Sequence, residues 1–128
     1  MNSNIKLIED YICDLCDEIF ADGIVCDKIY NPEQLVNRSA CITDIQSQET
    51  DQYAVIKCNV NISENRKTRA ECVEDTQKIV KNFNKSGVPL NDGLAIYMEI
   101  EYITMPIRIL VNTVTAYTIS ANIKVTAK

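Results

Sequence analysis

The last stretch of the chain, from Ala116 to Ala127, alternates strictly between apolar and polar side chains, and this alternation constrains the fold most. One side carries Tyr117, Ile119, Ala121, Ile123 and Val125, and the other carries Thr118, Ser120, Asn122, Lys124 and Thr126. A period of two residues predicts a strand with one buried face. Such a strand needs neighbouring strands and a covering layer, which the rest of the sequence must supply.

Further strands are predicted upstream. Residues 52–62 alternate in the same way, with Ala54, Ile56, Cys58, Val60 and Ile62 on the apolar side. Residues 39–45 look extended, and the polar residues 46–51 join the two segments into an antiparallel hairpin. Residues 94–103 predict another strand, whose apolar side holds Ile96, Met98, Ile100 and Tyr102. A short strand is expected at 24–29, inside a loop that runs to residue 39.

Two helices complete the pattern. Apolar residues at steps of three and four predict a first helix that Ser3 or Asn4 caps and Gly23 ends; its stripe is Ile5, Ile8, Ile12, Leu15 and Ile19. A second helix is predicted over 63–84, capped by Ser63 or Asn65 and ended by 86–87. Its predicted apolar stripe is Val73, Thr76, Val80 and Phe83, with Ala70 and Ile79 alongside. We expect this stripe to cover the buried face of the final strand.

These elements predict a single α+β domain over residues 1–128. The sheet is expected to be mostly antiparallel, with four to five strands and two helices packed on one face, in the order α-β-β-β-α-β-β. A length of 128 residues with 46% hydrophobic residues is sufficient for one core.

The connector at 104–112 is more apolar than a loop should be. Its apolar residues are Met105, Ile107, Ile109, Leu110 and Val111. They would face water unless something covers them. The connector is therefore either a strand of the same sheet or an exposed arm that binds a partner. In the second case Met105, Ile107, Ile109 and Leu110 are the contact residues.

Charge and composition restrict the function classes. The net charge of -5 argues against sequence-independent binding of nucleic acid and against binding to an anionic membrane. No apolar run approaches the roughly 20 residues that span a bilayer, and the first residues do not resemble a signal peptide. We therefore expect a protein of the cytosol, whose six cysteines are reduced thiols.

The sequence offers little for catalysis. The chain contains no histidine, which excludes the Ser-His-Asp and Cys-His arrangements. Cys13 and Cys16 have the spacing of a metal or redox motif, but they lie in mid-helix and a second pair is missing. Glu99 and Glu101 are read as ordinary residues of a solvated strand face. We expect no catalytic, cofactor-binding or metal-binding residue, no cofactor, and no enzyme activity.

Two charged clusters remain. Arg66, Lys67 and Arg69 form the single basic concentration, which either pairs with acids of its own helix such as Glu71 or Glu74, or contacts another subunit. The first helix carries Glu9, Asp10, Asp14, Asp17 and Glu18, which form either a solvated face or an acidic contact surface. A contact between the basic cluster and the acidic helix of a neighbour would be heterologous and could close a ring.

The arrangement resembles a known family. The matching stretches are 4–20, 31–35 running into 40–43, 53–62 followed directly by 63–83, and 97–128. Their order is similar to that of the tail terminator, or tail-completion, proteins of long-tailed phages and phage-derived tail-like particles. The resemblance implies a structural protein that forms a ring, typically of six copies. The ring caps the tail tube, stops its polymerisation and provides the surface where the neck or head docks.

The implied partners are further copies of the chain, the tail tube protein, and sheath or neck and connector proteins. The implied location is the host cytoplasm during assembly and then the virion or tail-like particle. The polar side of the final strand would be an interface or lumen surface. Two alternatives stay open: a head-tail connector or minor capsid protein, and a small binding module or assembly chaperone for another tail protein.

Overall fold

The computed structural model describes residues 3–21, 23–27, 38–50, 53–65, 68–89, 94–111 and 114–128. Two helices and seven strands follow one another in these ranges: α1 (Ser3–Ile19), β1 (Val25–Asp27), β2 (Arg38–Glu49), β3 (Ala54–Asn65), α2 (Arg69–Asn82), β4 (Lys85–Pro89), β5 (Ala95–Ile103), β6 (Ile107–Val111) and β7 (Val114–Ala127).

The strands form one sheet with β7 near its middle. The order is β1-β2-β3-β7-β5-β4, and β6 also pairs with β7. Strand β3 lies along one side of β7, from Ala54 opposite Ala127 to Asn65 opposite Ala116. Strands β5 and β6 share the other side of β7. The β1–β2 pair is parallel, and the other described pairs are antiparallel.

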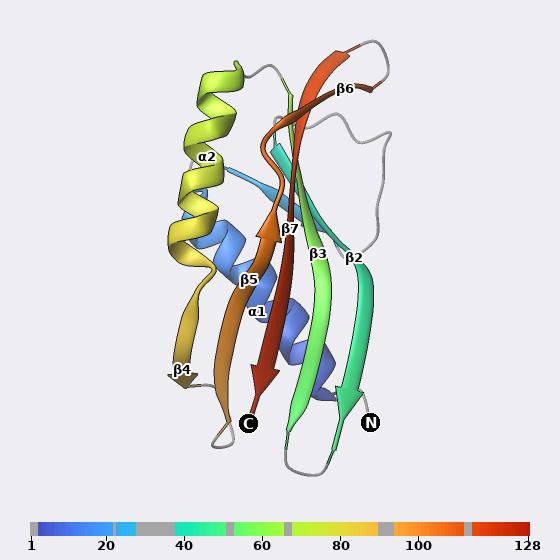
Figure 1. The fold of residues 1–128 in the computed structure, drawn as a ribbon, viewed down its shortest axis with the longest axis vertical. Helices are drawn as coiled ribbons and strands as arrows, with labels where there is room; N and C mark the ends of the chain where they lie inside the picture. The colour runs from blue at the N-terminus through green and yellow to red at the C-terminus, as the bar shows by residue number, and fades with distance from the viewer. Residues whose placement is uncertain are drawn as a thin grey trace.

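Both helices contribute to one core against the sheet. Helix α1 crosses behind the sheet and α2 lies beside its upper half (Figure 1). The largest buried side chains of the helices and of the residues directly after them are Ile8, Ile12 and Phe20 at α1 and Ile79 and Phe83 at α2. They share one core with the predicted apolar sides of β3 and β7, which are buried from Ala54 to Ile62 and from Ile119 to Val125, whereas Tyr117 is half-buried. The expectation of an α+β fold with a mostly antiparallel sheet is confirmed.

The expected strand count was too low. Strand β4 was missed because its residues look like a helix stop: Gly87 has a φ of 71° and Pro89 ends the strand. Gly87 instead lies at an irregularity in the β4–β5 pairing, between Ser86 and Val88. A short edge strand with few apolar side chains gives little periodic signal.

The predicted start of the second helix is wrong. Ser63 and Asn65 belong to β3, where they pair with Thr118 and Ala116 of β7. Thr68 caps α2 instead: its side chain accepts from the Glu71 N–H at 3.2 Å, and Glu71 Oε1 accepts from the Thr68 N–H at 2.9 Å. This reciprocal capping box fixes the first turn. Pairing with β7 therefore overrides the local capping tendency of Ser63.

Two predicted apolar faces are also displaced. The buried residues of α2 are Cys72, Asp75, Thr76 and Ile79. The buried face of the helix is therefore rotated about its axis from the predicted one, toward Cys72 and Asp75. Val73 is half-buried, and Val80 is 44% exposed. In β5 the register shifts between Ile100 and Tyr102, so Tyr102 is exposed and Ile103 packs against the core. The bulge reverses the faces after Ile100.

Candidate interaction surface

The connector at 104–112 contains a strand. Strand β6 pairs with β7 from Ile107 opposite Thr118 to Val111 opposite Val114, so the prediction of a strand in the same sheet is correct for 107–111. The side chains nevertheless stay exposed: Ile107 at 56% and Leu110 at 71%. The two alternatives read from the sequence are therefore not exclusive, because β6 is both a sheet strand and an apolar surface.

Strand β6 shows apolar side chains on both of its faces. Ile107 and Leu110 are three positions apart, an odd separation that places them on opposite faces of a strand. Among the described strands, β6 pairs with β7 alone, which leaves its other edge open. Exposed apolar edge strands are aggregation sites that folded proteins usually cover or interrupt with charge. This edge therefore has the character of a contact surface.

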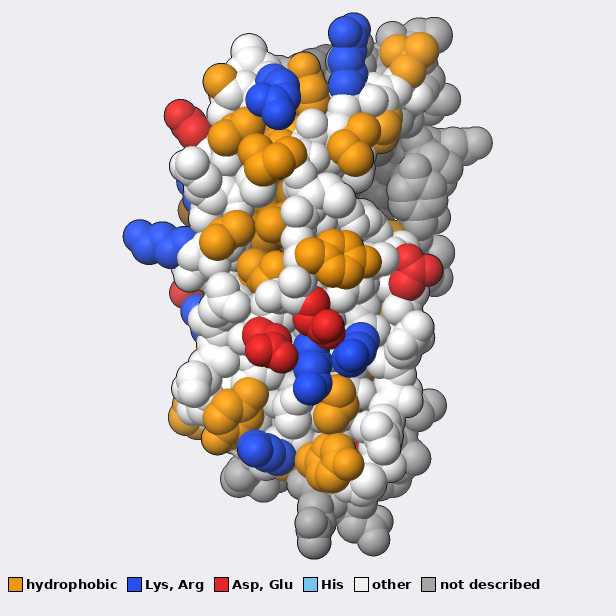
Figure 2. Space-filling view, in the orientation of Figure 1, with side chains coloured by type: hydrophobic (Ala, Val, Ile, Leu, Met, Phe, Trp, Pro, Cys, Tyr) orange, Lys and Arg blue, Asp and Glu red, His pale blue; other side chains and the backbone are white. Residues whose placement is uncertain are grey.

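An apolar groove lies beside this strand. It has a volume of about 310 Å³ and runs between α2 and the end of β5; its lining is Val73, Thr76, Gln77, Val80, Lys81, Ile103 and Met105. Met105 is 50% exposed. In the space-filling view, hydrophobic side chains gather in the upper part of the molecule, over α2 and β6 (Figure 2). We call Val80, Met105, Ile107 and Leu110 together the β6 surface.

Only some of the contact residues predicted from the sequence lie on the β6 surface. Met105, Ile107 and Leu110 belong to the β6 surface, whereas Ile109 is half-buried opposite the buried Ala116. Of the basic cluster, Arg69 is exposed in the first turn of α2. Arg66 and Lys67 lie outside the described residues.

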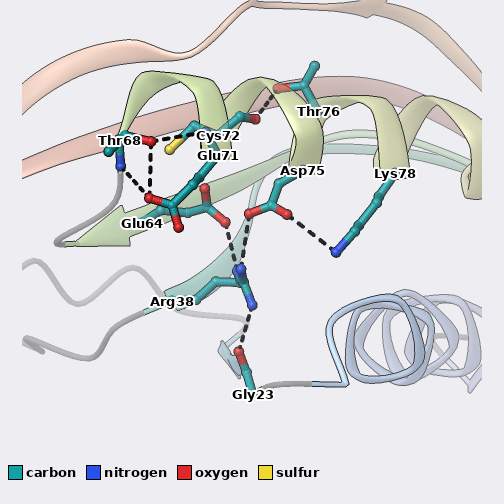
Figure 3. Close-up of polar contacts among 9 residues, drawn as sticks. All are labelled: Gly23, Arg38, Glu64, Thr68, Glu71, Cys72, Asp75, Thr76 and Lys78. Carbon is teal, nitrogen blue, oxygen red and sulfur yellow. Dashed lines mark hydrogen bonds and ion pairs between the residues drawn. The ribbon is translucent and has the colours of Figure 1, made fainter.

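Sequence reasoning missed a buried charged cluster built around Arg38 (Figure 3). The Arg38 guanidinium donates from Nε to Glu64 Oε1 at 2.7 Å and from Nη2 to Asp75 Oδ2 at 3.0 Å. It also donates from Nη1 to the Gly23 carbonyl at 3.1 Å, and its central carbon lies 4.5 Å from the centroid of the Phe20 ring. The cluster thus joins the end of α1, the start of β2, the end of β3 and the middle of α2.

The electrostatics of this cluster are unbalanced. Burial raises the pKa of the Glu64 carboxyl, the neighbouring Asp75 raises it further, and Glu64 Oε2 has no hydrogen-bond partner among the described residues. Lys78 Nζ lies 3.6 Å from Asp75 Oδ1. Burial and then Glu64 also raise the pKa of the Cys72 thiol to about 12. The side chains of Arg38 and Glu64 are only 4% and 0% exposed, so the cluster is buried where it joins the elements.

The cysteines differ from the expectation of six reduced thiols. Cys13 of α1 and Cys26 of β1 form a disulfide, with their Cα atoms 5.6 Å apart. The expectation is wrong for this pair because β1 lies against α1 and brings Cys26 to Cys13. Cys13 is bonded to Cys26 and not to Cys16, which is a buried free thiol whose pKa burial raises to about 12. The described residues contain no group of three potential metal ligands.

The polar side of β7 is joined to its neighbours by a ladder of side chains. Asn122 Nδ2 donates to Asn59 Oδ1 at 2.8 Å, and Asn59 Nδ2 donates to Asp44 Oδ2 at 2.8 Å. Ser63 and Thr118 lie 3.5 Å apart at their hydroxyls. These bonds order the outer face of the sheet across β2, β3 and β7.

No protein-family model and no curated protein sequence matches this chain. Within the part of the chain that the structure describes, neither helix has the length and apolar character that crossing a membrane requires.

Proposed function

We propose that this chain is a structural assembly protein that binds further copies of itself through the β6 surface, in the manner of a tail terminator. The observation that carries the proposal is strand β6, which pairs with β7 alone among the described strands and whose Ile107 and Leu110 are more than half exposed on opposite faces. A strand of this kind is stabilised when a partner covers both faces at once.

Covering this surface contributes free energy to assembly. Complete burial of one Ile, Leu or Met side chain contributes about 1.5–3 kcal/mol. Met105, Ile107 and Leu110 are each half to three-quarters exposed, so their remaining burial contributes about 1–2 kcal/mol apiece. In a ring every copy takes part in two contacts, and closure makes the contacts cooperative.

The order of the helices and strands supports the tail-terminator proposal through the resemblance described above. Helix α1, the β2–β3 hairpin, α2 and the closing strands follow the order that suggested a tail terminator. On this proposal the ring of copies caps a tail tube, stops its growth and presents a docking surface to the neck or head. The partners are other copies of the chain and the tube protein, and the protein ends in the virion or tail-like particle.

The first test is the double variant Ile107→Asp/Leu110→Asp. Both side chains are exposed, so the variant should keep the far-UV circular dichroism and melting temperature of the parent while its mass in sedimentation falls to that of a monomer. Ile45→Asp is the matched control, because Ile45 is 40% exposed on β2 and lies away from β6. A parent that is monomeric at every concentration, or a double variant that still assembles, would refute the proposal.

The specific role is tested in particles from cells that lack the gene. Overlong tails without a cap support termination. Tails of normal length contradict it and assign the protein to a connector or chaperone role instead.

A further inference from the structure

A group of lysines lies on the outer face of the sheet, away from the helices. Lys57 of β3 and Lys124 of β7 stand directly opposite each other in the register. Two grooves of about 330 and 470 Å³ flank Lys124 and share it with Thr126; Lys85 lines the first, and Lys57 and Lys128 line the second. We call Lys57, Lys85, Lys124 and Lys128 the lysine face.

The lysine face keeps an excess of positive charge. Glu101 Oε1 lies 3.6 Å from Lys57 Nζ, and Glu99 is opposite Lys124 in the register. Four lysines against two glutamates leave two positive side-chain charges in excess, although the whole chain carries -5. Like charges directly opposite on adjacent strands are destabilising. Glu101 and Glu99 offset part of the repulsion between Lys57 and Lys124, and an anionic group that docks beside the two side chains adds to that offset.

The flanking grooves are suited to a protein partner. Tyr97 lines the first groove, and Tyr53 and Val55 line the second. Lys128 Nζ lies 5.1 Å from the centroid of the Tyr97 ring. Tyrosine is enriched at protein interfaces, because it combines a large apolar body with a polar end.

The chain itself carries an acidic surface of matching geometry. Asp14, Asp17 and Glu18 are exposed on α1. Residues three and four apart on a helix are about 5–6 Å apart at their Cβ atoms, and opposite residues on paired strands are about 4.5–5.5 Å apart. The acidic spacing on α1 thus matches the spacing of Lys57 and Lys124.

We infer that the lysine face of one copy docks on the acidic side of α1 of the next copy. The two surfaces cannot meet within one chain. Helix α1 lies behind the sheet in Figure 1, whereas a group of lysine, arginine and acidic side chains lies on the face toward the viewer in Figure 2. The contact is therefore heterologous, and repetition of it produces a ring or a stack. This inference rests on the proposed self-assembly and names a second contact for it.

The lysine face is a second basic surface beside the cluster that the sequence analysis singled out. One of the two alternatives there placed the acidic helix against residues 66–69 at the start of α2, of which Arg69 is described and exposed. The lysine face brings four described lysines together over neighbouring strands. The contact also brings the excess positive charge of the lysine face to the neighbouring acids on adjacent turns of α1, whose like charges repel one another.

The test is a charge swap. Lys124→Glu/Lys128→Glu turns the excess of two positive charges on the lysine face into an excess of two negative charges and leaves the Lys57–Glu101 ion pair intact. Asp14→Lys/Asp17→Lys leaves Glu18 as the one acid of that side of α1, so the side formed by residues 14, 17 and 18 changes from acidic to basic. Each double variant alone should lose at least tenfold in self-association, measured by sedimentation at low salt, because both of its surfaces then carry the same sign. An equimolar mixture should assemble, since each variant supplies the complement of the other.

Circular dichroism confirms folding of each variant, and Glu74→Lys on α2 is the control for a charge change elsewhere. If the variants assemble alone as the parent does, or the mixture stays monomeric, the inference is overturned. The Ile107→Asp/Leu110→Asp variant separates the two ideas. If Ile107→Asp/Leu110→Asp fails to assemble while each charge-swap variant assembles alone, the proposed function stands and the lysine contact is refuted. If Ile107→Asp/Leu110→Asp assembles and the two charge-swap variants assemble only when mixed, the lysine contact stands and the β6 contact is refuted.

Discussion

Replacement of Arg38 by methionine should be the most destabilising single change in the charged cluster. The guanidinium donates hydrogen bonds to Glu64, Asp75 and the Gly23 carbonyl, and its central carbon lies 4.5 Å from the centroid of the Phe20 ring. Its loss leaves two carboxylates without their buried cation. Breaking a buried ion pair in this way costs about 3–5 kcal/mol. A domain of this size is stable by roughly 0.05–0.15 kcal/mol per residue, so the cost is a large fraction of the whole.

The assay is urea denaturation at pH 7, followed by far-UV circular dichroism. With a urea dependence of about 2 kcal/mol per molar, the midpoint of Arg38→Met should fall by roughly 1.5–2.5 M. The triple variant Arg38→Met/Glu64→Met/Asp75→Leu should recover most of this loss, because an apolar replacement of a whole buried charge group is often neutral. Arg69→Met, on the exposed start of α2, should change the free energy of unfolding by less than about 0.5 kcal/mol.

Two results would contradict this reasoning. A cost below about 1 kcal/mol for Arg38→Met would show that the cluster does not fasten the elements it joins. A triple variant as unstable as the single one would show that shape, and not uncompensated charge, determines the loss.

Three further predictions concern single features. Burial raises the pKa of the Glu64 carboxyl in the folded state, so the contribution of its protonation to the free energy of unfolding is complete below the unfolded pKa and is lost as pH rises through the folded pKa. The stability of Glu64→Gln relative to the parent, measured by urea titration, should therefore rise with pH between these two pKa values. A difference that does not change with pH would exclude this linkage. Thr68→Ala removes the capping box of α2 and should cost about 1 kcal/mol in thermal unfolding, whereas Ser47→Ala on the exposed part of β2 should cost almost nothing. Cys13→Ser/Cys26→Ser should lower the free energy of unfolding by about 2–4 kcal/mol without reductant and should leave melting insensitive to dithiothreitol; equal reductant sensitivity in parent and variant would argue against the bond.

The sequence predicted those elements whose signal is local and periodic. The alternation in β3 and β7 and the stripe of Ile8, Ile12 and Leu15 in α1 correspond to buried faces. The start of α2 was misplaced because Ser63 is a good capping residue, yet its backbone pairs with β7, more than fifty residues away. The pattern Thr68-x-x-Glu71 was the local signal that would have located the start correctly.

The charged cluster was not predictable from one sequence. Arg38 is 26 residues from Glu64 and 37 from Asp75, so no spacing rule connects them. A partial signal existed, since Glu64 continues the buried phase of Ala54 to Ile62 and an acid at that phase calls for a buried partner. For the connector, the apolar composition at 105–111 correctly marked an unusual surface, and the bulge in β5 could not be read from the sequence.

The central pairing of β3 with β7 has a consequence for synthesis of the chain. Strand β3 ends at Asn65 and β7 begins at Val114, yet the two pair over the whole length of β3. At about 5–20 residues per second, the ribosome needs roughly 2–10 s to add the residues between them. During that interval the edge of β3 that later pairs with β7 has no partner strand there. The middle of the sheet therefore closes late, and a nascent chain stopped before β7 has an unpaired strand edge that favours aggregation.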